Sequence, residues 1–571
     1  MAETIVSPGV LAIENDQSQI TQLPVEAGAA IVGPTVKGKV GIPTICTTYS
    51  DYSNKYGSTF ESGSQTFTYL TSISAYNYFQ NGGTSLLVTR VVSGSFTPAT
   101  SSIIQNIHTS SSLILETLTE GEIANSDGTL NANGTLVNGT SDNIRWQVTN
   151  RNINEGTFEL VVRRGDDTTL SPSRLETWSN LSLDPYSSNY VEKVIGNQTE
   201  VISSDAGEFY VKMQGEYANN SRYIRVKSIN TTTPEYFDNN GDPKPQFTGS
   251  LPITSSGAFG SAIGSNISTT TGKYYENISN DNIQGLQATD YADSISLLGN
   301  KEAYRYNLLT TPGLISDFGL HSTTITNTIN TCQNRGDAMA VIDLVRYGSN
   351  LTTVTTQAKT YDTSYVAAYW PWVQTIDPNT ARQVWVPAST LIPGIYAFND
   401  RIAAPWFAPA GQNRGIMSTA IRAERYLTQG NRDTLYENKI NGIVTFPNTG
   451  VTVFGQKTLQ KKKTALDRIN VRRLLIELKG FISQVADTLV FEQNNVTTRN
   501  TFLSQVNPYL NSVQNQQGLT EFKVIMDESN NTPTTIDNNQ LIGQIYLQPV
   551  RSAEFIILDF NVLPTGATFP S

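Results

Sequence analysis

The stretch from Ala29 to Val92 decides the fold class. It begins with the apolar run Ala29-Ala-Ile-Val-Gly33, continues with apolar residues at helical spacing from Phe67 to Gln80, and ends with Ser85-Leu-Leu-Val-Thr-Arg-Val-Val92. Short apolar runs on either side of a helix are typical of strands that are buried on both faces of a sheet. We therefore predict α/β structure for residues 26–95.

The same pattern returns in the last part of the chain. Ala338–Val345 and Ser364–Val373 predict buried strands, Gly415–Arg425 predicts a helix, and Asp467–Val490 predicts a long amphipathic helix. A second helix is expected from about Thr498, with a break at Pro508 and an end before Gly518. Residues 301–552 therefore read as a second block of core structure.

Residues 96–300 have a different character. They are rich in Ser, Thr, Asn and Gly, and short alternating runs such as Phe158–Arg163 and Tyr223–Lys227 lie between turn clusters. A disordered linker is the alternative, but the recurring apolar alternation favours one or more β-rich inserted domains. We predict an α+β multidomain chain: an extended arm at 1–25, a discontinuous core, the insertion, and strands from Phe522 to Val562 that end in a C-terminal arm at 553–571.

Composition excludes several classes of function. The 571 residues carry a net charge of −10, with two His and two Cys. Clustered zinc ligands, a disulfide scaffold and general nucleic-acid binding are all disfavoured by these numbers. No apolar stretch is long enough for a membrane span, and the N-terminal residues lack a secretory pattern. We expect no metal, no cofactor, no nucleic acid and no membrane insertion.

One motif resembles a phosphate-binding loop. Gly33-Pro-Thr-Val-Lys-Gly-Lys39 matches G-x-x-x-x-G-K, but Val40 stands where Ser or Thr would bind magnesium. The following Gly41-Ile-Pro43 does not open a helix well. We predict that this segment binds no nucleotide.

Catalytic motifs are equally weak. A Ser-His-Asp triad would have to use His108 or His321, and each is more simply a lone structural or surface histidine. A pair of carboxylates is always available among 49 acidic residues, so it carries no signal. Asp238-Asn-Asn-Gly-Asp242 is better explained by a turn than by a calcium loop. We predict no catalytic residue.

The stretch from Lys457 to Lys479 is strongly basic. Eight basic and two acidic residues give it a net charge of +6, so the rest of the chain carries −16. A local positive stripe on an acidic molecule is typical of a surface that binds an acidic partner. The alternative is a solvated helix face, or internal pairing of Arg472 or Arg473 with Asp467 or Glu477.

Several motifs, taken in order, resemble the tail sheath proteins of contractile-tailed bacteriophages. The motifs are Ser7-Pro-Gly-Val10, Asn81-Gly-Gly83, Tyr369-Trp-Pro-Trp372, Pro393-Gly-Ile-Tyr-Ala-Phe-Asn-Asp400, Ala404-Pro-Trp-Phe-Ala-Pro-Ala-Gly411, Asp467-Arg-Ile-Asn-Val-Arg-Arg-Leu474 and Tyr546-Leu-Gln-Pro-Val-Arg-Ser552. The resemblance covers about 1–95 and 300–571. It does not extend to the insertion, which suits a family whose outer domains vary.

The resemblance implies a structural and not an enzymatic role. Sheath subunits polymerise as stacked hexameric rings around a tail tube and contract to drive the tube through the host envelope. Implied partners are other copies of the chain, the tube protein, and the baseplate and tail terminator proteins. The implied location is the virion tail, after assembly in the bacterial cytoplasm. Alternatives are the sheath of a phage-like bacteriocin or injection system, and a carbohydrate-binding or hydrolysing tail β protein.

Two sets of residues are implied as sites. Family members exchange strands through their terminal arms, which here points to Val10, Ala12, Glu14, Phe555, Ile557 and Asp559. The alternative is that these strands pair only within their own domain. The second set is a basic patch that would face the tube: Lys461, Lys462, Lys463, Arg468, Arg472 and Arg473.

Overall fold

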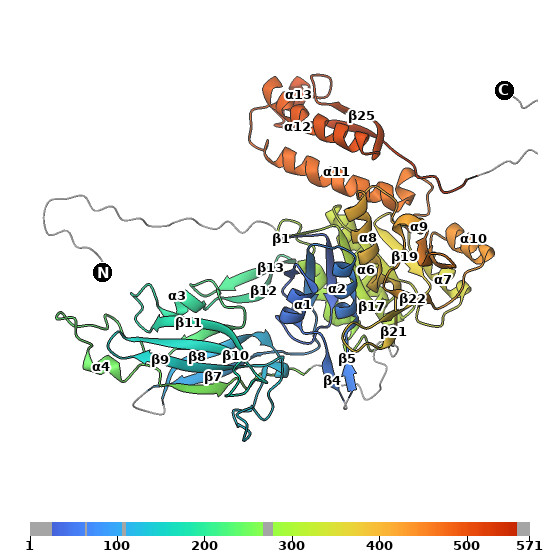
Figure 1. Cartoon of the computed structure of the whole chain (residues 1–571). Helices are drawn as coiled ribbons and strands as arrows, with labels where there is room; N and C mark the ends of the chain where they lie inside the picture. The colour runs from blue at the N-terminus through green and yellow to red at the C-terminus, as the bar shows by residue number, and fades with distance from the viewer. Residues whose placement is uncertain (1–24, 63–64, 106–109, 266–277, 557–571) are drawn as a thin grey trace, which may run out of the picture.

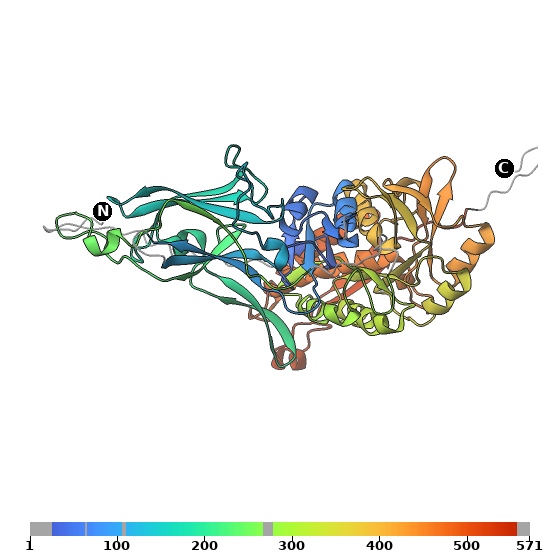
Figure 2. The same ribbon diagram turned by 90° about the horizontal axis from the view of Figure 1, so that it is seen from below.

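The computed structural model describes residues 25–62, 65–105, 110–265 and 278–556. Three units are visible in Figure 1: a central α/β domain, a β-rich insertion that projects from one side, and a C-terminal unit of two long helices and a hairpin that lies on top. Seen from below, the insertion and the central domain form one elongated body (Figure 2). The prediction of a mixed α/β chain with several sheets is confirmed.

An eight-stranded sheet forms the centre of the α/β domain. Its order is β24 (Gly450–Phe454), β23 (Asn441–Phe446), β19 (Val366–Trp370), β18 (Met339–Asp343), β17 (Leu308–Ile315), β2 (Ala29–Gly33), β6 (Leu86–Arg90) and β3 (Thr44–Cys46). The six strands from β23 to β6 are parallel, and the two edge strands are antiparallel to their neighbours. Two segments of the chain, 29–90 and 308–454, therefore share one sheet, and the insertion leaves and re-enters between β6 and β17.

Helices cover both faces of this sheet. Because side chains alternate along a strand, Ile31 and Val88 face one apolar core while Ala30 and Leu87 face the other. The first core packs against α1 (Tyr49–Tyr56), α2 (Leu70–Gln80) and α8 (Ile392–Ile402). The second packs against α5 (Ala292–Leu297), α6 (Ser322–Arg335), α7 (Leu351–Ala358) and α10 (Gln429–Glu437). Burial on both faces explains why the strands read as unbroken apolar runs.

The insertion is a β-sandwich. One sheet has the order β11 (Arg174–Ser182), β10 (Thr157–Arg164), β9 (Ile144–Asn152) and β15 (Ser255–Ala258), and the other has β14 (Ile224–Ile229), β8 (Ser111–Glu120) and β7 (Pro98–Ile104). Trp146 and Leu160 of the first sheet share an apolar core with Leu115 and Val226 of the second. A separate hairpin, β12 (Thr199–Asp205) and β13 (Glu208–Gln214), reaches back to the central domain.

The insertion ends earlier than the sequence pattern indicated. Ile283, Tyr291, Ile295 and Leu298 are buried in the second core of the central domain, not in the sandwich. Smaller sheets complete the domain. They are β1 (Val25–Ala27) with β16 (Tyr304–Tyr306), β4 (Phe60–Ser62) with β5 (Gln65–Phe67), and β21 (Gln383–Val386), β20 (Val373–Ile376) and β22 (Ala420–Ala423).

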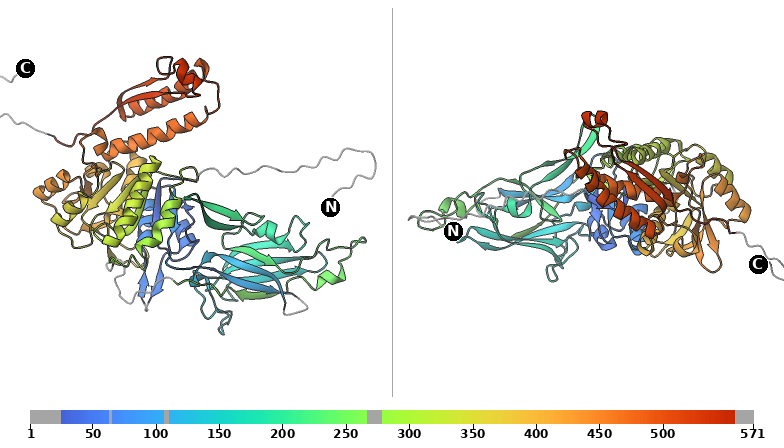
Figure 3. Two further views of the ribbon diagram at one scale, coloured as in Figure 1. Left: turned by 180° about the vertical axis from the view of Figure 1, so that it is seen from behind. Right: turned by 90° about the horizontal axis from the view of Figure 1, so that it is seen from above.

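The C-terminal unit packs α11 (Ile469–Asp487) against α12 (Val496–Asn515) and the antiparallel pair β25 (Leu519–Ile525) and β26 (Gln544–Pro549). A short helix, α13 (Pro533–Asp537), joins the two strands. Views from behind and from above show this unit lying on the central domain, apart from the sandwich (Figure 3).

Two expectations about secondary structure are wrong. Residues 415–425 contain β22 in place of a helix, because Ala423 pairs with Val373 of β20 and this tertiary pairing overrides the local pattern. Helix α12 also runs through Pro508 without a break. Pro508 and Ser504 are both exposed, so the carbonyl that loses its helical donor at Pro508 can bond to water.

Candidate functional site

The six predicted basic residues do not share one environment. Lys461, Lys462 and Lys463 are exposed in the loop before α11, and Arg468, at its N-cap, is half-buried. Arg472 and Arg473 are buried, with 4% and 7% of their surface exposed. The exposed positive charge therefore comes from the loop, and the two arginines inside the helix face the protein.

Both buried arginines attach α11 to the central domain. Arg473 makes a two-bond ion pair with Asp400 of α8, at 2.8 and 2.5 Å, and its guanidinium lies 4.7 Å from the Tyr396 ring centre. Burial would lower the pKa of Arg473, but the Asp400 carboxylate raises it above its ordinary value. Arg472 donates to the Ser364 hydroxyl and lies 4.0 Å from the Tyr365 ring centre.

These partners differ from the ones that the sequence suggested. Internal pairing was expected with Asp467 or Glu477, because both are near in sequence. Asp467 instead accepts contacts from Lys457 and Arg468, at 3.4 and 2.7 Å. No sequence signal identifies Asp400, which is 73 residues from Arg473.

Arg468 binds the segment 551–556, which follows the last strand of the C-terminal unit. Its Nε and Nη2 donate to the two carboxylate oxygens of Glu554, at 2.6 and 2.9 Å. Tyr436 donates its hydroxyl to the same carboxylate at 2.6 Å. The amide of Gln456 donates to Glu554 at 3.0 Å and to Ser552 at 2.8 Å. We call these five residues the C-terminal clasp.

The electrostatics of the clasp favour an ionised Glu554. Burial raises its pKa, but the hydrogen bonds from Tyr436 and Arg468 and the arginine charge outweigh burial, and the net shift is downward. Burial, together with the neighbouring Glu554, raises the pKa of Tyr436 to about 12, so its hydroxyl remains a donor. The clasp is thus a charge-assisted network that is fully formed at neutral pH.

Of the predicted arm residues, the described part of the chain contains only Phe555. It belongs to no strand, is 75% exposed, and lies edge-on to Tyr436 with ring centres 5.8 Å apart. Val10, Ala12, Glu14, Ile557 and Asp559 lie outside the described residues. Strand exchange by either arm therefore stays a prediction.

The hairpin of the C-terminal unit offers two open strand edges. β25 and β26 pair with each other from Leu519↔Pro549 to Ile525↔Gln544. Within the described ranges, neither strand has a second neighbour. The outer N–H and C=O groups of a two-stranded sheet are available to an added strand.

The segment that resembled a phosphate-binding loop has a different role in the structure. Lys37 pairs with Asp142 at 3.0 Å, and Lys39 pairs with Glu200 of β12 at 2.5 Å. No helix follows, since the next regular element is the short strand β3. The two lysines connect the central domain to the insertion, which supports the prediction that they bind no nucleotide.

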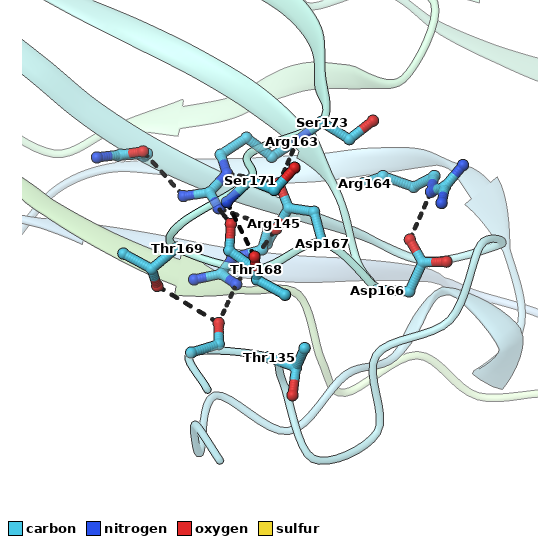
Figure 4. Close-up of polar contacts among 12 residues, drawn as sticks. Thr135, Arg145, Arg163, Arg164, Asp166, Asp167, Thr168, Thr169, Ser171 and Ser173 are labelled. Atoms are coloured by element: carbon cyan, nitrogen blue, oxygen red, sulfur yellow. Dashed lines mark hydrogen bonds and ion pairs between the residues drawn. The ribbon is translucent and has the colours of Figure 1, made fainter. Parts of the chain in front are cut away.

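A buried ion cluster in the sandwich is a second concentration of polar groups (Figure 4). Arg163 donates to both oxygens of Asp167, at 2.8 and 2.9 Å, and Arg145 approaches the same carboxylate at 3.4 Å. Ser173 donates its backbone N–H to Asp167 at 2.8 Å. These contacts tie the loop after β10 to the sheet, which is a structural role.

The remaining candidates also have structural roles. His321 is buried and accepts a hydrogen bond from the Ile315 amide at 3.1 Å, and burial lowers its pKa; His108 lies outside the described residues. The Asp238 carboxylate accepts backbone hydrogen bonds from Asn240 and Asp242, as in a turn.

Among the described residues, no three His, Cys, Asp or Glu side chains are grouped to hold a metal ion. In that same part of the chain, no helix is both long and apolar enough to cross a bilayer.

A solved structure has the same architecture. A crystal structure of a sheath tail protein from Listeria innocua superposes with a TM-score of 0.53 and 11% identity, covering 92% of this chain and 95% of that chain. At this identity the likeness establishes the fold alone, which is that of a sheath tail protein.

Sequence comparison then gives the family. Residues 281–459 match the phage tail sheath protein central domain, and residues 461–563 match the phage tail sheath C-terminal domain. The chain thus has two regions that match domains of phage tail sheath proteins, and the resemblance noted from its motifs is confirmed.

Two curated relatives show how far this similarity extends. The tail sheath protein of Vibrio phage KVP40 is 39% identical over 193 residues, which is 34% of this chain and 29% of that protein. The tail sheath protein of Enterobacteria phage T4 is 37% identical over 185 residues, which is 32% of this chain and 28% of that protein. The match spans under a third of the length of either relative.

Proposed function

We propose that this chain is the structural subunit of a contractile phage tail sheath. Copies would stack as hexameric rings around a tail tube, between baseplate and terminator proteins, in a virion tail assembled in the bacterial cytoplasm. Contraction would drive the tube through the host envelope without catalysis. The observation that carries the proposal is the β25–β26 hairpin, which lies in the matched C-terminal domain and has two open edges.

Added strands would join neighbouring subunits at these edges. Residues 10–14 and 555–559 of other copies are the proposed strands. Main-chain hydrogen bonds give affinity with little dependence on the orientation of the rest of the molecule. Subunits would therefore stay connected while their bodies rotate, and better burial between subunits in the short state would supply the work.

We restrict the proposed tube-facing surface to part of the basic stretch. Lys461, Lys462 and Lys463 are exposed, whereas Arg472 and Arg473 are buried against the central domain. We assign tube contact to the three lysines, and Arg468 remains at the edge of that surface. Exposed charge pairs contribute about 0–1 kcal/mol each and are screened by salt, which suits a contact that forms in assembly and releases on contraction.

The central test is deletion of residues 1–20. The full chain should form long tubes that are visible by electron microscopy, and the truncated chain should remain folded by circular dichroism but form none. Normal tubes from the truncated chain would sink the strand-exchange proposal. Tube contact is tested separately by changing Lys461, Lys462 and Lys463 to Glu and measuring sheath assembly on purified tail tubes, with undiminished assembly as the contrary result.

A further inference from the structure

A cavity of about 720 Å³ lies beside the C-terminal clasp. Its wall includes the end of α10, the loop before α11, the first turn of α11 and the segment from Arg551 to Phe555. Pockets that bind small organic molecules have volumes of about 300–1,000 Å³. The cavity therefore has the size of an organic ligand and is larger than a single inorganic ion requires.

Two of the three carboxylates in the wall are already paired. Both oxygens of Glu554 accept hydrogen bonds within the clasp, where Arg468 is the cation. The two oxygens of Asp467 contact Lys457 and Arg468. Glu437, the third acidic residue of the wall, is exposed. Lys457 and Arg468 thus use the charge of the two inner carboxylates.

Three further cations of the wall lack such a partner. Lys439, Lys463 and Arg551 line the cavity and form no ion pair with any described residue. Only Glu437 stands against them, so the wall carries five cations and three carboxylates, a net charge of +2. A phosphate monoester carries about −1.5 to −2 at pH 7 and would balance this charge.

The pKa of the Lys457 ammonium agrees with an excess of positive charge. Burial and, after it, the charge of Arg468 lower this pKa below its ordinary value. The Asp467 carboxylate raises it but does not compensate, and Lys439 lowers it further. An anion in the cavity would relieve this repulsion among the cations.

An open aromatic ring lines the same cavity. Phe555 is 75% exposed, and its only ring contact among the described residues is with Tyr436, at 5.8 Å between ring centres and 83° between ring planes. This edge-to-face contact leaves the Phe555 ring accessible for stacking. Aromatic side chains beside cations are the combination with which proteins stack a nucleobase and bind its phosphate.

The N-terminus of α11 adds to the positive potential. Asn470 and Val471 of its first turn line the cavity, and the helix has no side-chain cap and no acidic residue in that turn. Its first amide, that of Ile469, already donates to the Gln456 carbonyl at 2.9 Å. We therefore assign no hydrogen bond between the helix end and a ligand, and count only the helix dipole, which favours an anion within about one turn.

From the charge balance, the volume and the open ring we infer that the cavity is a binding site for a nucleoside monophosphate. In this assignment the phosphate contacts Lys463 and Arg551, and the base stacks on Phe555. The ligand connects the loop before α11 to the segment 551–556 and stabilises the C-terminal clasp. The site belongs to the single chain and does not depend on the sheath assembly proposed above.

Titration calorimetry of the full chain in 0.15 M salt tests the site. The ligands are adenosine 5′-monophosphate, adenosine, which lacks the phosphate, and ribose 5-phosphate, which lacks the base. One variant changes Lys463 and Arg551 to Gln, and its matched control changes Lys461 and Lys462 to Gln, which removes the same charge at exposed positions outside the cavity. A further variant is Phe555→Ala.

We expect adenosine 5′-monophosphate to bind, adenosine not to bind, and ribose 5-phosphate to bind about fivefold more weakly or less, because base stacking is lost. The Lys463/Arg551 variant should lose about tenfold or more in affinity, because two charge-assisted contacts are removed. The Lys461/Lys462 variant should lose less than about threefold, since exposed charges more than about 8 Å away are largely screened at this salt. Phe555→Ala should bind adenosine 5′-monophosphate no better than ribose 5-phosphate.

Hydrogen–deuterium exchange locates the ligand independently. Adenosine 5′-monophosphate should slow exchange of residues 551–556 in the natural chain and leave it unchanged in the Lys463/Arg551 variant. Absent binding, or equal losses in the two double variants, overturns the site. Ribose 5-phosphate that binds as tightly as adenosine 5′-monophosphate overturns the assignment of a nucleotide. Binding without protection of residues 551–556 overturns this cavity as its location.

Discussion

Arg468 and Glu554 form a two-bond ion pair across 86 residues of sequence, with Nε–Oε1 at 2.6 Å and Nη2–Oε2 at 2.9 Å. This pair fixes where the C-terminal segment leaves the central domain, next to Tyr436 and Gln456. Any arm that begins after Ile556 therefore starts from a defined position beside α11.

Replacing Glu554 by Gln should release the segment 551–556. Gln keeps the shape but removes the charge that Arg468 requires, and we expect a local loss of about 1–3 kcal/mol. Hydrogen–deuterium exchange of residues 551–556 measures this local loss of stability. Glu528→Gln, at an exposed position in no ion pair with a described residue, is the control. Equal protection in the two variants would show that the clasp does not hold the segment.

The clasp should also open in acid. The pKa of Glu554 lies below its ordinary value of 4.5, so the stabilisation is present above pH 4.5 and is lost as the pH falls through the lower, folded-state value. Exchange of residues 551–556 should therefore stay constant from pH 7 to about pH 5, after correction for the intrinsic rate, and rise at lower pH. A rise already between pH 7 and 6 would contradict this assignment.

Asp343 should make the central domain less stable at high pH. Burial raises its pKa to about 7, against the opposing hydrogen bonds from Ser389, while the unfolded chain keeps the ordinary 3.8. The folded state therefore holds a proton between these values, and stability falls as the pH rises through that window. Asp343→Asn should be more stable than the natural chain at pH 8, by on the order of 4 kcal/mol at most, with no difference below pH 4.

Urea unfolding at pH 4, 6 and 8 measures this dependence. The exposed Asp537→Asn is the control, and it should follow the natural chain at every pH. A constant difference between Asp343→Asn and the natural chain across the pH range would mean that the carboxyl does not titrate in the folded state.

Arg473 should matter for stability more than for tube contact. Arg473→Met leaves Asp400 without its partner inside the protein, and we expect a loss of about 2–3 kcal/mol. This is less than the roughly 3–5 kcal/mol of fully buried pairs because Asp400 is 32% exposed. Lys462→Met should change stability by less than about 0.5 kcal/mol. Equal losses of stability for Arg473→Met and Lys462→Met in denaturant unfolding would contradict the structural role of Arg473.

The ion pair between Lys39 and Glu200, which links the central domain to the insertion, should stabilise the β12–β13 hairpin through charge. Lys39→Glu should expose the β12–β13 hairpin to protease at low salt, and adding Glu200→Lys should restore its protection. Because both side chains are partly exposed, the pair contributes about 0–1 kcal/mol, and the contrast should fade at 1 M salt. Failure of the charge-reversed pair to restore protection would show that packing of Ile202 and Val211, not charge, holds the hairpin.

Sequence patterns predicted secondary structure best for strands that are buried on both faces and for helices with one apolar face. The runs at Ala29–Gly33 and Met339–Asp343 are strands because both faces of the sheet are covered, and α11 was evident from its apolar face. The strand β22 was missed because its pairing partner is about 50 residues away. The clasp was missed for the same reason: nothing near Arg468 in sequence points to Glu554 or Tyr436.

Four properties could be read without the structure: the α/β class of the core, the β-rich insertion, the absence of chemical motifs and the resemblance to sheath proteins. These properties depend on local periodicity, composition and short motifs. The role of each charge depends instead on tertiary contacts. The basic stretch divides into exposed lysines, the clasp at Arg468 and buried arginines, because burial and ion pairing depend on residues that the fold brings together from distant parts of the chain.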